Sequence, residues 1–151
     1  MKSDARKGGD TKLAISNVML IDDCEVDRMQ CARLLGKARF AMRLFRYPAA
    51  KQALTDLVDR ASHNDSPDMV LLDLNMPSMD GFEFLDAASQ SLGDSLGGTK
   101  VVMMSDAMIE ADRRRAESHP AVRMVLHKPL DRSDLDRITD LADSAPRKAD
   151  L

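Results

Sequence analysis

Four short, mostly apolar runs, each followed directly by a polar side chain, constrain the fold of this chain more than any other feature. They span residues 17–21, 69–72, 100–104 and 123–127. Apolar runs of this length are typical of strands that are buried on both faces of a parallel sheet. The carboxyl ends of such strands form one edge of the sheet, where ligands and chemistry collect. The sequence therefore predicts that the polar residues after these runs lie close together.

Segments with helical spacing of apolar residues alternate with these runs. They lie at about 26–38, 48–61, 82–89, 108–117 and 131–141, and the partly alternating run 41–46 suits an edge strand. Residues 93–99 contain three glycines and are expected to form a flexible connection. Five strands alternating with five helices predict a doubly wound α/β fold with a parallel sheet in the order 2-1-3-4-5, as in flavodoxin-like proteins.

The length of 151 residues favours a single domain, which we place at residues 13–143. The polar residues 1–12 are expected to form a disordered arm, and 144–151 a flexible tail. No apolar run approaches the length of a membrane span and no signal peptide is visible, so a cytoplasmic protein is expected. A net charge of −3 argues against nucleic-acid binding.

The two cysteines and the eleven methionines are expected to have structural roles. Cys24 and Cys31 are separated by about 10 Å if one helix holds both, which is too far for a disulfide bond. We therefore expect two free thiols in a reducing compartment. Methionine is expected to fill the core.

Polar residues at four predicted strand ends suggest chemistry at the sheet edge. Asp22 and Asp23 follow the first strand, Asp73 the third, Ser105 the fourth and Lys128 the fifth. Three neighbouring carboxylates repel one another unless a cation joins them, and Mg²⁺ prefers such oxygen ligands. With Mg²⁺ and Lys128 neutralising phosphoryl oxygens, and with a hydroxyl donor at Ser105, the group suits phosphoryl transfer to Asp73.

Each of these residues also has an ordinary interpretation when it is taken alone. The Asp22-Asp23 pair is equally consistent with a cap on the first helix. Lys128, which precedes a proline, is by itself typical of a surface lysine. The functional interpretation depends on all four strand ends meeting at one edge.

Four motifs make the chain resemble a response-regulator receiver domain of the CheY type. They are L-I-D-D at 20–23, D-L-N-M-P-S-M-D-G at 73–81, V-V-M-M-S at 101–105 and K-P-L at 128–130. The resemblance covers about residues 15–143. It implies that Asp73 accepts a phosphoryl group from a histidine kinase or a histidine phosphotransfer protein, and that phosphorylation controls binding to a downstream protein.

The resemblance also implies roles for the other site residues. Asp23, Asp73 and the backbone carbonyl of Asn75 would ligate Mg²⁺, and Asp22 would help through water. Ser105 and Lys128 would bind the phosphoryl oxygens. It further implies a cis peptide bond at 128–129, and homodimers through the face made by the fourth helix, fifth strand and fifth helix are common in similar domains.

Two positions depart from the family pattern. Val125 stands where the family often has an aromatic switch residue, and Asp106 stands where it usually has a small one. With no output domain in these residues, we expect a single-domain regulator that is not an enzyme beyond its own phosphorylation and dephosphorylation. A phosphorylation-independent adaptor is the alternative. A phosphohydrolase would need a second aspartate as acid and base, but Asn75 occupies that position.

Overall fold

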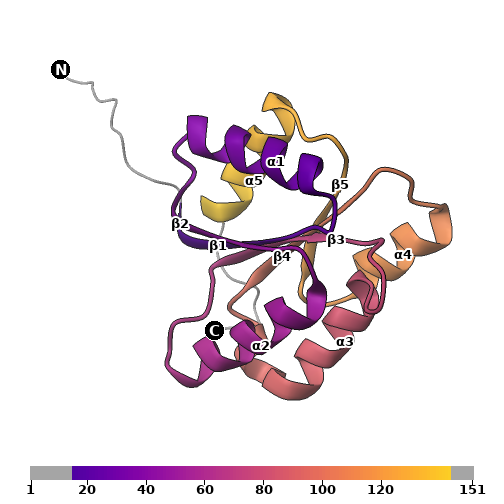
Figure 1. The fold of residues 1–151 in the computed structure, drawn as a ribbon. Coiled ribbons are helices and arrows are strands. Elements are labelled where there is room, and N and C mark those ends of the chain that lie inside the picture. Colours follow the sequence, from indigo (N-terminus) through magenta and orange to yellow (C-terminus); the bar gives the residue numbers. More distant parts are fainter. Residues whose placement is uncertain (1–14, 144–151) are drawn as a thin grey trace.

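A five-stranded parallel sheet lies at the centre of the protein (Figure 1). The computed structural model describes residues 15–143, so the predicted arm at 1–12 and tail at 144–151 lie outside the described residues. The strands are β1 (Ile15–Ile21), β2 (Ala41–Tyr47), β3 (Met69–Asp73), β4 (Lys100–Ser105) and β5 (Val122–His127). Their order, β2-β1-β3-β4-β5, confirms the predicted arrangement and the doubly wound α/β class.

Helices cover both faces of the sheet (Figure 1). They are α1 (Glu25–Lys37), α2 (Ala50–Ser62), α3 (Gly81–Leu92), α4 (Glu110–Ser118) and α5 (Arg132–Asp143). One face carries α1 and α5, and the other carries α2, α3 and α4. Within the described residues, no helix combines the length and the apolar character needed to cross a membrane.

Side chains along the central strands alternate between two hydrophobic cores, one on each face of the sheet. In β3, Met69 and Leu71 pack with α1 and α5, whereas Val70 and Leu72 pack with α2, α3 and α4. All four are fully buried. Because both faces are covered, every position favours an apolar residue and the strand reads as one continuous run. Each such side chain contributes about 1.5–3 kcal/mol by burial, and Met69 confirms the expected use of methionine in the core.

The edge strand β2 is held by polar and aromatic contacts with α2. The guanidinium carbon of Arg60 lies 3.7 Å from the centroid of the Phe45 ring, and its Nε donates to Asp56 over 2.7 Å. Asp56 also accepts a hydrogen bond from the Tyr47 hydroxyl. Burial and this bond raise the pKa of Tyr47 to about 12, so its hydroxyl stays protonated. The Tyr47 carbonyl accepts the backbone N–H of Asp22 at 3.1 Å, which ties the edge strand to the site described below.

The connection before β4 differs from the prediction. Residues 93–99 were expected to be flexible, but Gly93–Leu96 form a 3₁₀ helix and the Leu96 side chain is buried in the core. The Thr99 hydroxyl, also buried, donates to the carbonyl of Pro67 at 2.8 Å. Three glycines suggest conformational freedom, but the single apolar anchor at Leu96 gives this segment a fixed place. The fourth helix begins at Glu110 rather than 108.

Candidate functional site at the carboxyl edge of the sheet

The four strand ends predicted from the sequence do meet at one edge of the sheet. Asp73 ends β3 and pairs in register with Met104 of β4, and Ser105 pairs with His127 of β5. Asp22 and Asp23 directly follow β1, and Lys128 directly follows β5. A parallel sheet places all of these ends on the same side, which is why sequence order alone located the site.

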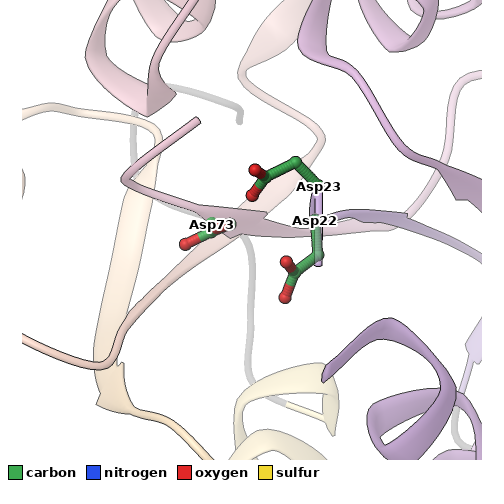
Figure 2. Close-up of side chains that lie close together, drawn as sticks. All are labelled: Asp22, Asp23 and Asp73. Atoms are coloured by element: carbon green, nitrogen blue, oxygen red, sulfur yellow. The ribbon is translucent and has the colours of Figure 1, made fainter. Parts of the chain in front are cut away.

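Three aspartates form the acidic centre of this edge. One carboxylate oxygen from each of Asp22, Asp23 and Asp73 lies within 4.8 Å of the others. Figure 2 shows Asp22 and Asp23 leaving the end of one strand in opposite directions, with Asp73 on the neighbouring strand. Asp22 and Asp73 are only 1% and 3% exposed, whereas Asp23 is open to solvent. The cluster therefore has two buried members and one that a ligand reaches from outside.

Burial governs the charge state of Asp73. Loss of solvent, followed by repulsion from Asp22, raises the pKa of Asp73 from 3.8 to about 7. The ammonium of Lys128 and the backbone N–H of Asn75 act in the opposite direction. Without an added cation, the carboxyl group of Asp73 is therefore partly protonated near neutral pH. A cation bound at the cluster favours its ionised, nucleophilic form.

Lys128 is buried against three carboxylates. Its Nζ lies 2.9 Å from Asp27 Oδ2, 3.0 Å from Asp22 Oδ2 and 3.4 Å from Asp73 Oδ1. Burial alone would lower the pKa of Lys128, but the hydrogen bonds to Asp27 and Asp22 outweigh it and raise the pKa above its ordinary value. The peptide bond from Lys128 to Pro129 is cis, as the family resemblance implied. Lys128 is thus a permanently charged member of the site rather than a surface lysine.

Asp27 was not among the residues predicted for the site. It lies in the first turn of α1, and its side chain is 30% exposed. The available signal was its place as an acidic residue in the first turn of the helix that follows the Asp22-Asp23 pair. That signal is weak because acidic residues are common in the first turn of any helix.

Ser105 already takes part in hydrogen bonds on the other side of Asp73. Its Oγ accepts the side-chain amide of Asn75 at 3.2 Å and the backbone N–H of Ala107 at 3.1 Å. The backbone N–H of Asn75 points to Asp73 Oδ1 at 3.4 Å. The side-chain NH₂ of Asn75 is thus engaged with Ser105, and the resemblance assigns the backbone carbonyl of Asn75 to the cation. The role of that carbonyl stays a prediction.

The loop after Asp73 returns the chain tightly to the sheet. Asp80 and Glu83 form a reciprocal cap at the start of α3, with bonds of 2.8 and 2.9 Å. At Gly81, a Cβ would lie 2.9 Å from the carbonyl oxygen of Asp73 and 2.9 Å from the Met103 side chain. Only glycine allows this approach, which fixes the backbone next to Asp73.

The two departures from the family pattern have different surroundings. Val125 is buried and packs in the core on the side of α2, α3 and α4. Asp106 is exposed to solvent. The Asp22-Asp23 pair does not cap α1: the N-cap residue is Cys24, no side chain caps the helix, and Asp22 Oδ1 accepts the backbone N–H of Cys24 itself at 2.9 Å. Both Cys24 and Cys31 are free thiols, as expected.

The donor set of the acidic centre fits Mg²⁺. The ion prefers one or two carboxylates and keeps several waters, and it needs closely spaced oxygen atoms. Asp23 and Asp73 offer such oxygens, while one oxygen of Asp22 is engaged by Lys128. This leaves Asp22 better suited to contact through water than to direct coordination.

Comparisons with known proteins agree with this geometry. The family described as "Response regulator receiver domain" matches residues 18–140. The probable methanogenesis regulatory protein FilR2 of Methanothrix harundinacea is 32% identical over 124 residues, which is 82% of this chain and 78% of that protein.

Two solved structures extend the comparison. A two-component response regulator from Cytophaga hutchinsonii has a TM-score of 0.80 at 21% identity, covering 85% of this chain and 96% of its own. A response regulator receiver protein from Dyadobacter fermentans has a TM-score of 0.73 at 25% identity, covering 87% and 99%. With five parallel strands in the CheY-like order and the family match across the acidic edge, this chain belongs to the response-regulator receiver domain family.

Proposed function

We propose that this receiver domain accepts a phosphoryl group on Asp73 from a phosphohistidine donor, in a Mg²⁺-dependent reaction, and signals through phosphorylation-dependent protein binding. The observation that carries the proposal is the buried Asp73 carboxylate, which is clustered with the acidic pair and lies 3.4 Å from the ammonium of Lys128. A histidine kinase or a histidine phosphotransfer protein is the donor expected for this family.

In the proposed reaction, an Asp73 carboxylate oxygen attacks the phosphorus atom of the phosphohistidine. A new O–P bond forms while the N–P bond breaks, and the imidazole nitrogen leaves with the bonding electrons. Bound Mg²⁺ would supply positive charge to the phosphoryl oxygens. Lys128 supplies a second, fixed positive charge from the α1 side, 3.4 Å from the acceptor.

Ser105 supplies a hydroxyl donor once it reorients toward the phosphoryl group. In the structure its oxygen accepts from Asn75 and from the backbone of Ala107, so its own proton is free to be directed elsewhere. A bond from Ser105 to the phosphoryl group would therefore pull on the loop that leads to α4. That loop is the first step of a route to the surface formed by α4, β5 and α5.

Phosphorylation must change the protein surface without an aromatic switch residue on β5. The buried Val125 has no ring to rotate between an inward and an outward position. We therefore propose that the output depends on the loops at Ser105 and Lys128 and on the helices that they hold. Beyond its own phosphorylation and hydrolysis of the aspartyl phosphate, the domain needs no enzymatic activity for this role.

Incubation with a small phosphodonor and Mg²⁺, followed by intact-mass measurement, tests the proposal. We expect the wild type to gain the mass of one phosphoryl group, and Asp73→Asn and samples in EDTA to gain none. Asp136→Asn, the same substitution at an exposed position of α5, is the matched control and should be phosphorylated normally. If the wild type gains no phosphoryl group under these conditions, the proposal is wrong and the interaction-only adaptor is favoured.

A further inference from the structure

We propose that Asp27 is a positioning residue that holds Lys128 against α1 and so restrains its pairing with a phosphoryl group on Asp73. The inference rests on the proposed function, because it concerns the response of Lys128 to that phosphoryl group. It concerns a residue of α1 that lies outside the acidic centre and that the sequence motifs did not identify.

The hydrogen bonds of Lys128 are the first observation. An ammonium group has three donors. Asp27 and Asp22 accept hydrogen bonds from it at 2.9 and 3.0 Å, while Asp73 forms an ion pair with it at the longer distance of 3.4 Å. The side chain of Lys128 is only 9% exposed, so water does not offer it a ready substitute. Phosphorylation adds up to two negative charges and three acceptor oxygens beside Asp73. When Lys128 Nζ moves toward those oxygens, its hydrogen bond to Asp22 or to Asp27 lengthens.

The surroundings of the two nearer carboxylates decide which bond lengthens. The side chain of Asp22 is 1% exposed, so the loss of Lys128 would leave a buried, unpaired charge. The side chain of Asp27 is 30% exposed, so solvent can hydrate it when the lysine moves away. The hydrogen bond from Lys128 to Asp27 is therefore the one that lengthens.

The shape of the protein beside this pair leaves room for the movement. A cavity of about 410 Å³ lies between α1 and the segment after β5, and Asp27, Lys128 and Pro129 are among the residues that line it. Because Asp27 borders this cavity, its carboxylate has space beside it. Arg28, the next residue of α1, donates to the Asp22 carbonyl at 2.7 Å and keeps the start of the helix attached to the site.

Substitution can separate the charge of Asp27 from the length of its side chain. Asp27→Asn keeps the shape and one acceptor but removes the charge that competes for the ammonium. Asp27→Glu keeps the charge on a longer side chain. Glu25→Gln removes one charge from the same turn of α1 at an exposed position, and it serves as the control for net charge.

Beryllofluoride, a phosphoryl mimic, is titrated with Mg²⁺ into the wild type and each variant. Binding is followed by amide NMR spectra, which also report whether each variant is folded. We expect Asp27→Asn to bind it about two- to fivefold more tightly than the wild type, the change typical of losing one partly exposed ion pair. Asp27→Glu and Glu25→Gln should remain close to the wild type. Equal or weaker binding by Asp27→Asn, or an equal gain in Glu25→Gln, would overturn the inference.

A second readout does not depend on the phosphoryl mimic. The ammonium signal of the Lys128 side chain, followed by NMR at one fixed pH, should shift in Asp27→Asn relative to the wild type; an unchanged signal means that Asp27 does not hold the lysine. If the wild type fails to bind beryllofluoride while this shift is present, the proposed function fails and the contact between Asp27 and Lys128 stands. The two failures are therefore distinguishable.

Discussion

Replacing the acceptor by its neutral analogue should stabilise the unmodified protein, and the size of the effect follows from the burial of Asp73. In the folded protein its pKa is about 7, against 3.8 for the ordinary group. The folded state therefore binds more protons than the unfolded state between these two values. The free energy of unfolding falls as the pH rises through this window. Above pH 7, the stability that the protonated Asp73 contributes is fully lost.

The magnitude comes from the same two pKa values. At about 1.36 kcal/mol for each unit of pKa, ionising Asp73 in the folded protein costs about 4 kcal/mol above pH 7. An amide resembles the protonated carboxyl group in shape and charge, so Asp73→Asn behaves as if it were always protonated. We expect the variant to be more stable than the wild type by up to about 4 kcal/mol at pH 8 and to match it near pH 4.

Urea unfolding followed by circular dichroism, in EDTA between pH 4 and pH 8, measures this difference. Asp136→Asn, at an exposed position, should stay within about 0.5 kcal/mol of the wild type at every pH. Mg²⁺ at ten times its dissociation constant should stabilise the wild type by about 1.4 kcal/mol and have little effect on Asp73→Asn. A pH-independent difference, or a variant that is less stable at pH 8, would refute the reasoning.

Other substitutions and reagents test the close packing around the site. Gly81→Ala should lower the free energy of unfolding by about 1–3 kcal/mol because its Cβ would collide with the Asp73 carbonyl, whereas Gly36→Ala, with nothing within 4 Å, should raise it by up to about 1 kcal/mol. If urea unfolding gave the same change in the free energy of unfolding for both variants, the close approach at Gly81 would not be the cause. Burial raises the pKa of the Cys31 thiol to about 12, so a thiol reagent at pH 8 should modify the exposed Cys24 and leave Cys31 unmodified until the protein is unfolded. Rapid modification of both thiols in the folded protein would show that the cavity beside α1 admits the reagent.

The sequence predicted most of the fold because the physical requirement on each central strand is local. A strand such as Met69–Asp73, covered on both faces, must be apolar at every position, and this pattern is visible without any partner. The edge strand β2 was recognised for the opposite reason, since its burial is incomplete. Residues 93–99 were mispredicted because two isolated anchors, the buried Leu96 side chain and the Thr99 hydroxyl, hold them in place rather than a repeating pattern.

The sequence by itself also determined which residues gather at the candidate site. Asp22, Asp23, Asp73, Ser105 and Lys128 each directly follow or end a strand, and parallel strands bring their carboxyl ends to one edge. Their proximity therefore follows from chain order and strand direction alone. No long-range detail is needed to predict it.

Only the tertiary structure decided which of these groups touch one another. Lys128 lies close to three carboxylates, and its contact with Asp27 depends on how α1 is packed beside the segment after β5. The burial of Asp73, and with it the raised pKa, likewise depends on side chains from several elements. Periodicity in a sequence specifies the face on which a residue lies, but the pairing of long charged side chains depends on distances of a few ångströms between separate elements.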